Sequence, residues 1–321
     1  MADEEVWTTK GSSHARKSLS PRRLFKSSQD DLGHQSLFDP ASFLTLYLPG
    51  SGNKPLDPLA VSAVHRTLVD TPAPTLAVHL TLVDMCLLGL QEQGNLKKGS
   101  LWLLTEPLDE RYAIDILERY LCMKTLVIVT ILAASNISES AKILAKWVRL
   151  ADELERRLKN YFGFRCLASG LVSSPHLMNW NQLWYEVKGG YPDEWQLLNE
   201  AIPTVMKSGW KVEVATVPDV VPFALAKVNW DEEESRLWPI SGAASVERCA
   251  AMSETFKKNG QVLRHIKCPD DLLLDLFRTE FHIRLFWGSN GVAEFPQNFK
   301  ERHAKFARVL SALAAICSRQ Y

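Results

Sequence analysis

Apolar side chains recur at helical spacing over most of this chain, and the clearest example runs from residue 138 to residue 184. The predicted buried face of its first helix carries Ile143, Trp147, Leu150, Ala151, Leu154 and Leu158. We expect this helix to end near residues 161–163, and a second apolar segment to cover residues 164–172. A turn signal at residues 173–175 follows, and helical spacing resumes up to Trp184. The stretch is therefore predicted to form a helical hairpin with aromatic anchors in the core.

Polar residues define the start and the outer face of the first of these helices. Asn136 followed by Glu139 offers a start that resembles a capping box. Acid-first pairs four residues apart are expected on the exposed face, each contributing about 0.3 kcal/mol: Asp152–Arg156, Glu153–Arg157 and Glu155–Lys159.

Helical spacing predicts further helices on both sides of this hairpin, at residues 59–68, 75–90, 111–134, 193–206, 243–258, 270–286 and 298–317. Residues 126–134 are apolar on nearly every side, so the helix that contains them should be central and buried. Two short extended pieces are expected, one around Leu44, Leu46 and Leu48 and one at residues 212–216. The pattern as a whole predicts an all-α fold.

Charge and cysteine usage narrow the class of protein. The 321 residues carry 37 Lys and Arg against 37 Asp and Glu, a balance that favours neither nucleic acid nor a membrane surface as partner. The apolar run 126–134 is far shorter than the ~20 residues of a transmembrane segment. The first residues include acids and no apolar stretch, unlike a signal peptide. The six cysteines lack metal-site spacing, so reduced thiols in a cytoplasmic protein are expected.

Two regions of different composition follow one another along the chain. Residues 1–36 are polar, Ser-rich and basic, and they predict a disordered tail. Residues 37–321 are predicted to form the helical domain. Ser18 follows two basic residues and Ser20 precedes a proline, so both are candidate phosphorylation sites. Phosphate there would partly cancel the positive charge of the tail.

No active site built from side-chain chemistry is predicted. The chain lacks GxSxG and HExxH motifs, and its eight histidines are dispersed. Residues 50–54 lack the spacing of a phosphate-binding loop, and Pro55 prevents a helix from starting there. We therefore expect no catalytic residue, no cofactor and no metal.

Three blocks of this sequence resemble the catalytic domain of Ras-type guanine-nucleotide exchange factors. Residues 75–84 resemble its first block, residues 118–132 with 145–154 its second, and residues 160–175 its third, which closes at Trp184. The resemblance covers residues 53–317. It implies the all-α exchange-factor fold with a helical hairpin that either protrudes or folds back.

A more specific resemblance leads to the NSP adaptors, the novel Src-homology-2-containing signalling proteins. It rests on residues 53–57, 108–118 and 217–222, and above all on residues 278–291, continued at 305–313. The signature positions of the long motif are Arg278, Thr279, Glu280, Phe281, Arg284, Trp287 and Gly288. Family members usually carry an N-terminal Src-homology-2 domain. These residues leave no room for one, so phosphotyrosine binding is not expected of them.

The resemblance implies one of two functions. In active exchange factors the hairpin opens the nucleotide site of a Ras-family GTPase and stabilises its nucleotide-free state. Here Leu225 stands where the block before the hairpin has glycine, and the final Asp-Leu of that block is missing, which argues against exchange activity. NSP adaptors use the hairpin to dock the C-terminal four-helix domain of Cas-family scaffolds. A signalling adaptor without exchange activity is favoured; an active exchange factor and a helical scaffold with an unrelated partner stay open.

The hairpin is expected within residues 241–263. The family docks through a leucine and an arginine four residues apart, and ungapped counting places Ala243 and Glu247 at these positions. With a gap, the candidates become Val246, Arg248 and Met252. Such a helix-on-helix interface has an apolar centre and a polar rim. The resemblance also implies a cytoplasmic protein that its partners recruit to membranes or adhesion sites.

Overall fold

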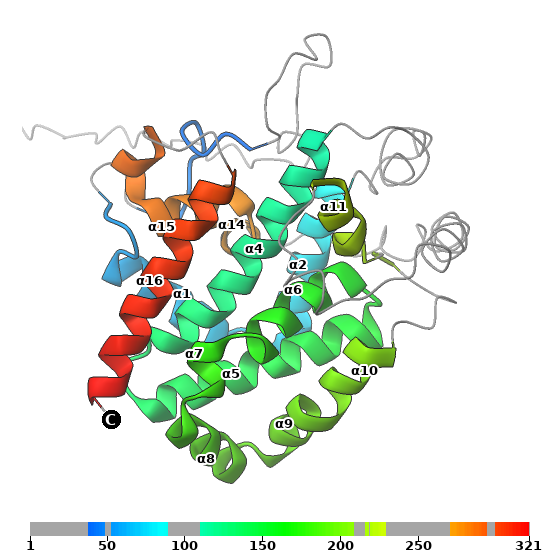
Figure 1. Ribbon diagram of the computed structural model, residues 1–321, viewed down its shortest axis with the longest axis vertical. Helices are drawn as coiled ribbons and strands as arrows, with labels where there is room; N and C mark the ends of the chain where they lie inside the picture. The colour runs from blue at the N-terminus through cyan, green and yellow to red at the C-terminus, as the bar shows by residue number, and fades with distance from the viewer. Residues whose placement is uncertain are drawn as a thin grey trace, which may run out of the picture. The chain divides into compact units, whose positions relative to one another are not determined.

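The computed structural model describes residues 38–48, 53–88, 110–208, 216–217, 219–228, 270–293 and 299–320. All of them belong to one compact unit of the chain, His34–Tyr321. Their regular structure is helical, apart from an isolated parallel bridge between Asn160 and Val217 (Figure 1). The predicted all-α fold is confirmed. The predicted tail and the predicted docking hairpin lie outside the described residues.

The first group of helices comprises α1 (Pro58–Asp70), α2 (Ala73–Leu87), α4 (Glu110–Leu132), α5 (Ile137–Asp152), the π-helical turn η2 (Glu153–Arg157) and α6 (Tyr161–Val172). The second group comprises α7 (Pro175–Met178), α8 (Asn181–Gly190), α9 (Pro192–Gln196), the π-helical turn η3 (Leu197–Ala201), α10 (Ile202–Ser208) and α11 (Val221–Val228). The last described helices are α14 (Asp271–Leu276), α15 (Thr279–Ala293) and α16 (Phe299–Gln320). Within the described ranges, no helix is both long enough and apolar enough to cross a bilayer.

Helix α4 is the central element, as the apolar run in its second half predicted. Every side chain from residue 115 to residue 132 is buried except Lys124, which is half-buried. Around it pack α1, α5, α6, α11, α15 and α16 (Figure 1). Because α4 contacts both early and late helices of the described chain, charged groups on it can hold distant segments in place.

Short polar side chains set the helix starts. Asn136 accepts a hydrogen bond from the Glu139 N–H at 2.9 Å, and the Glu139 carboxylate accepts one from the Ser135 N–H at 2.8 Å. This arrangement confirms the capping start predicted for α5, with the return bond one residue earlier than in a capping box. Asp57 at α1 and Asp270 at α14 also cap their helices, each by accepting a hydrogen bond from the backbone N–H two residues further on.

The hairpin around α5 and α6 forms, but its first helix ends earlier than expected. Lys159 has φ +52°, which takes the chain out of the helix, and Asn160 then caps α6. Residues 161–163 therefore open α6 and do not close the preceding helix. Of the predicted surface pairs, Asp152–Arg156 and Glu153–Arg157 form. The third does not: Lys159 has left the helix, and Glu155 lies 3.9 Å from Arg156 instead.

Other boundaries also depart from the predicted spacing. The predicted helix 270–286 is broken at residues 277–278 into α14 and α15. The predicted extended piece around residues 44–48 is wrong. Leu44 and Leu46 are exposed, and the backbone there donates to a side-chain carboxylate, that of Asp275, instead of to a neighbouring strand. Residues 212–215 of the second extended piece lie outside the described residues.

The last described helix is fixed to the centre by a buried ion pair. Arg302 at the start of α16 donates to the Glu118 carboxylate of α4, and His303 Nε2 lies 3.4 Å from Glu118 Oε1. Further along, the Cys317 thiol lies 3.0 Å from the Leu132 carbonyl, so α16 and α4 run parallel. Burial alone would raise the pKa of Glu118, but its contacts with His303 and Arg302 outweigh burial and lower the pKa below its ordinary value.

This pair predicts a specific pH dependence. A carboxyl group whose pKa is lowered in the folded state stabilises it above the unfolded pKa, and this stabilisation is lost as the pH falls through the folded pKa. We therefore expect the free energy of unfolding to fall more steeply below about pH 4.5 in the wild type than in Glu118→Gln. Urea unfolding curves between about pH 6 and pH 3 measure both slopes. Parallel slopes would show that Glu118 does not titrate in this way.

Candidate functional site

The structure describes the two ends that flank the predicted docking hairpin. Helix α11 ends at Val228, and Asp270 caps α14. The candidate docking residues between these ends, Ala243, Val246, Glu247, Arg248 and Met252, lie outside the described residues. So do the phosphorylation candidates Ser18 and Ser20. The structure therefore informs on this site through the two helices that flank it, α11 and α14.

At the first end, α11 packs directly on the central helix α4. Ala224 and Leu225 are buried, with Leu225 only 3% exposed. Leu225 occupies the position at which the resembling exchange-factor block has glycine. The larger side chain is thus part of the contact between α11 and the core.

A buried ion pair and backbone hydrogen bonds hold the segment that leads into α11. The Arg165 guanidinium of α6 donates to the Asp219 carboxylate, with Nε at 2.5 Å from Oδ2, and both side chains are buried. Just before Asp219 in the sequence, the Val217 carbonyl accepts a hydrogen bond from the Tyr161 N–H at 2.9 Å, and the Thr216 N–H donates to the Lys159 carbonyl at 3.0 Å. The path into α11 is therefore fixed to the start of α6.

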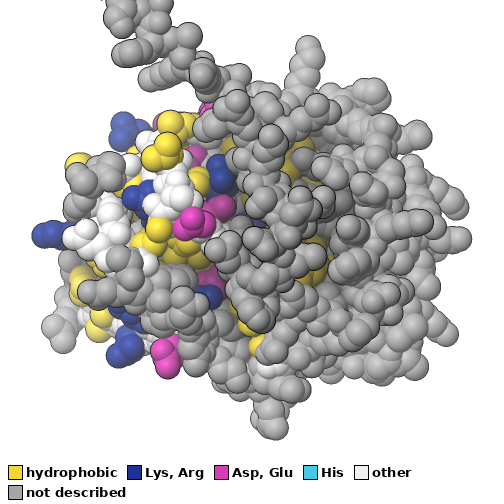
Figure 2. All heavy atoms as spheres, turned by 90° about the horizontal axis from the view of Figure 1, so that it is seen from above, with side chains coloured by type: hydrophobic (Ala, Val, Ile, Leu, Met, Phe, Trp, Pro, Cys, Tyr) yellow, Lys and Arg dark blue, Asp and Glu magenta, His cyan; other side chains and the backbone are white. Residues whose placement is uncertain are grey.

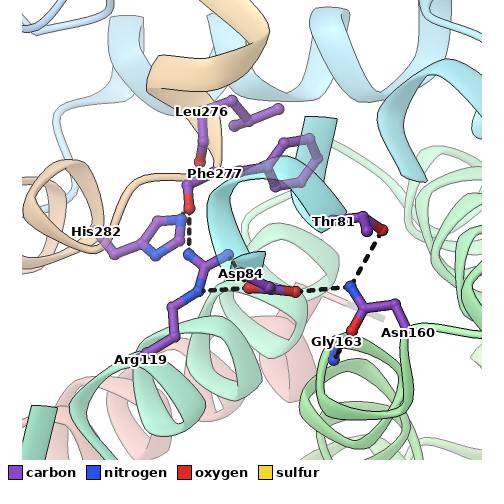
Figure 3. A network of polar contacts seen from close by, with 8 residues as sticks. All are labelled: Thr81, Asp84, Arg119, Asn160, Gly163, Leu276, Phe277 and His282. Carbon is purple, nitrogen blue, oxygen red and sulfur yellow. Dashed lines mark hydrogen bonds and ion pairs between the residues drawn. The ribbon is translucent and has the colours of Figure 1, made fainter. Parts of the chain in front are cut away.

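At the second end, a buried arginine of α4 reaches the junction between α14 and α15 (Figure 3). Arg119 donates to the Phe277 carbonyl and, through Nη2 and Nε, to Asp84 Oδ1 of α2 at 2.8 and 3.1 Å. Asp84 Oδ2 accepts a hydrogen bond from Asn160 Nδ2 at 2.9 Å, and Asn160 Nδ2 also lies 3.1 Å from Thr81 Oγ1. These groups join α2, α4, α6 and the end of α14 in one network.

His282 completes this junction as a neutral group. Burial and, to a smaller extent, the charge of Arg119 lower the pKa of His282 to about 3. The neutral ring therefore donates its Nε2–H to the Leu276 carbonyl, with 2.9 Å between the two atoms (Figure 3). Two adjacent carbonyl groups at the end of α14 are thus held by side chains from the core, His282 on Leu276 and Arg119 on Phe277.

The predicted family signature forms a clamp on residues 43–48 and 53–56. Arg284 donates to the Phe43 carbonyl, and the Arg278 guanidinium lies 4.3 Å from the centroid of the Phe43 ring. Phe281 packs against Tyr47 with 5.3 Å between ring centroids. Thr279, Glu280 and Trp287 are buried beside them, and the Lys305 ammonium lies 3.8 Å from the centroid of the Trp287 indole. Within the described residues, these side chains hold parts of the domain together.

Gly288 allows the clamp to close. It has φ +74° and ψ 170°, a region adopted almost exclusively by glycine. A Cβ there would lie 2.7 Å from the Asn53 carbonyl oxygen, a backbone atom. On either side of it, the Leu56 N–H donates to the Leu285 carbonyl and the Ser289 N–H to the Asn53 carbonyl.

Gly288→Ala should therefore lower the free energy of unfolding by about 2–3 kcal/mol, through backbone strain and the Asn53 clash. Gly291→Ala in the same helix is the control, because its Cβ would lie 3.5 Å from the nearest atom, an ordinary contact. Urea denaturation of the two variants measures the difference. Equal stabilities would show that the backbone at Gly288 tolerates a side chain.

Sequence reasoning missed the buried charged residues that hold these ends. Asp84 and Arg165 each stand within otherwise apolar helical text, and that isolation is the signal that could have singled them out. Arg119 directly follows Glu118, so its neighbourhood gave no such signal. Asn160 lies in a block that resembles exchange factors, but nothing in its spacing indicated a partner 76 positions away.

Comparison with known proteins agrees with this architecture. Residues 75–213 match the RasGEF domain family. The chain is 28% identical to the SH2 domain-containing protein 3C of Homo sapiens over 305 residues, which cover 87% of this chain and 35% of that protein. It is 26% identical to the breast cancer anti-estrogen resistance protein 3 homolog of Mus musculus, over 87% of this chain and 37% of that protein. Residues 75–213 are thus similar to RasGEF domains, and most of the chain is similar to these two proteins.

The predicted resemblance to exchange-factor domains of the NSP branch is thus confirmed. The chain spans little more than a third of the length of the curated relatives it matches. The activities and partners of those complete proteins can therefore only be proposed for this chain.

Proposed function

We propose that this domain acts as a docking module of a cytoplasmic signalling adaptor, without exchange activity, and that it binds the C-terminal helical domain of a Cas-family scaffold. The main support for the absence of exchange activity comes from the block before the hairpin. In this chain it forms α11, with Leu225 buried against α4 where the exchange-factor pattern has glycine. Leucine lacks the backbone freedom of glycine, so a block that needs glycine at this position is not expected to form the same conformation here.

Surface character supports a protein partner. On the face seen in Figure 2, the described hydrophobic, basic and acidic side chains are interspersed. Surfaces that bind nucleic acid concentrate basic groups on one face, and the described part of this face does not. The docking residues proposed are Ala243 and Glu247 or, with a gap, Val246, Arg248 and Met252. Recruitment to membranes or adhesion sites would follow from the partner.

The test is release of a fluorescent guanine nucleotide from a panel of Ras, Rap and Ral GTPases. We expect stoichiometric amounts of this protein to leave the release rate of each GTPase unchanged. An active exchange factor included in each assay confirms that the GTPases respond. Clear acceleration of release from any member of the panel would overturn the proposal.

The match of residues 75–213 to the RasGEF domain family favours a second candidate function, exchange activity on a Ras-family GTPase. This function requires acceleration of nucleotide release that depends on the hairpin. Replacing Glu247 or Met252 should then abolish the acceleration. A rate that stays the same in both variants would count against this candidate.

Phosphorylation of the basic tail at Ser18 or Ser20 is proposed as a way to modulate docking. Six basic residues, Lys10, Arg16, Lys17, Arg22, Arg23 and Lys26, surround these serines. Each phosphate adds about −1.5 to −2 charges at neutral pH, so modification would reduce the local positive charge.

A further inference from the structure

An unbroken series of polar contacts connects the two described ends that flank residues 229–269. One end is α11 with residues 216–217 and 219–220 before it, and the other is α14 with the junction at Phe277. The two ends lie far apart in sequence. The contacts that connect them pass through α4, α2 and the start of α6.

Asn160 is the residue at which the contacts from the two ends meet. Its side-chain amide donates to Asp84, which pairs with Arg119, and Arg119 donates to the Phe277 carbonyl at the end of α14 (Figure 3). Its backbone pairs with Val217 in a parallel bridge, whose hydrogen bonds are made by the two neighbours of Asn160: the Tyr161 N–H donates to the Val217 carbonyl, and the Val217 N–H donates to the Lys159 carbonyl. The Asn160 side chain is fully buried, so no solvent competes for its hydrogen bonds to Asp84 and Thr81.

The local geometry leaves little freedom at this residue. Asn160 Oδ1 caps α6 through the Gly163 N–H at 2.8 Å, so the same side chain also fixes the start of that helix. A Cβ on Gly163 would lie 2.7 Å from Asn160 Nδ2 and 2.8 Å from Asp84 Oδ2. The tight packing holds the amide in the orientation that reaches Asp84.

We propose that Asn160 is a positioning residue that fixes both ends of the segment 229–269 relative to each other. With Asn160 intact, α11 and the α14–α15 junction are held at one separation. The inference rests on the proposed function only in assuming that a partner binds between these ends. The network itself is independent of any partner.

Two variants of Asn160 separate this role from helix capping. Asn160→Asp keeps an oxygen that can cap α6 but places a second carboxylate beside Asp84. Asn160→Ser keeps a capping hydroxyl, adds no charge, and is too short to reach Asp84. The matched control is Arg302→Met, which breaks a buried ion pair on α4 that holds α16 and takes no part in this network.

Amide hydrogen exchange of the whole chain, followed by mass spectrometry under native conditions, measures the effect without a partner. Both Asn160 variants should raise exchange at least tenfold in residues 216–228 and in residues 271–278 together. Arg302→Met should raise exchange in α16 and leave both of those segments within threefold of wild type. Faster exchange at only one end, or an equal rise in the Arg302 variant, would overturn the proposal.

Binding of the Cas-family helical domain supplies the second readout. Asn160→Ser should weaken binding at least tenfold, whereas Arg302→Met should stay within threefold of wild type. If wild-type protein does not bind at all, the proposed function fails, and the exchange measurement still decides whether Asn160 positions the two ends. If wild type binds and Asn160→Ser binds equally well, the positioning role is wrong.

Discussion

Replacing Arg119 by methionine should lower the free energy of unfolding by about 3–5 kcal/mol, because it leaves the buried Asp84 carboxylate without its counter-charge. Asp84 is 1% exposed and Arg119 is 0% exposed, so water cannot replace the lost hydrogen bonds. The Phe277 carbonyl would lose its donor as well. Urea unfolding at neutral pH measures the loss.

Arg156→Met is the control for this experiment. It removes the same type of side chain from an ion pair with Asp152, but that arginine is 60% exposed. Exposed pairs contribute little, so the change should stay within about 0.5 kcal/mol. The double variant Arg119→Met with Asp84→Asn should recover part of the loss, because the buried negative charge is gone. A loss below about 1 kcal/mol in Arg119→Met would show that the buried pair contributes little to stability.

The pH dependence of the Arg119 variant follows from the environment of Asp84. Burial raises the pKa of Asp84 above its ordinary value, while the charge of Arg119 and the hydrogen bonds from Asn160 and Arg119 oppose the rise. Without Arg119 the pKa should rise further. A carboxyl group with a raised folded pKa favours folding less as the pH increases from its unfolded pKa towards its folded pKa. The stability gap between variant and wild type should therefore be smaller near pH 5 than near pH 7.

Trp147→Ala should have an effect of similar size, about 3–5 kcal/mol, because it opens a large cavity between α5 and α4. Trp147 is completely buried, and its indole N–H donates to Thr130 Oγ1 of α4 at 2.9 Å. Trp147→Phe retains most of the ring volume, so it should lose roughly half as much or less. Trp184→Ala is the control, because that side chain is only partly buried. Urea unfolding that places all three variants within about 1 kcal/mol of one another would show that the core tolerates loss of Trp147.

The sequence was sufficient to predict the fold because the apolar periodicity is strong. Residues such as Ile143, Trp147 and Leu154 repeat at helical steps and are all fully buried. The apolar second half of α4 identified the central helix for the same reason. Element type is determined by local spacing, and local spacing is visible in a sequence.

Boundaries were less predictable because single residues decide them. The end of η2 depends on Lys159 adopting a positive φ angle, which no apolar pattern reveals. The break between α14 and α15 depends on side chains of α4 and α15 that hold the Leu276 and Phe277 carbonyls. Such tertiary contacts override the spacing that predicted one continuous helix.

The polar network could not be predicted because its members are scattered in sequence. Asp84, Arg119, Asn160 and Phe277 stand on four elements, and only the folded arrangement brings them together (Figure 3). The signature motif, in contrast, was found as a contiguous pattern. Its described contacts show what two of its residues do: Arg284 binds the Phe43 carbonyl, and Gly288 lets residues 53–55 approach α15 closely.

Calorimetric titration of this chain with the C-terminal helical domain of a Cas-family scaffold tests the proposed docking function most directly. We predict a one-to-one complex with a dissociation constant at or below about 1 µM, equivalent to roughly −8 kcal/mol of binding free energy. Helix-on-helix interfaces with an apolar centre reach such affinities. Folded protein that gives no binding heat at about 100 µM, and no complex on gel filtration at that concentration, would contradict it.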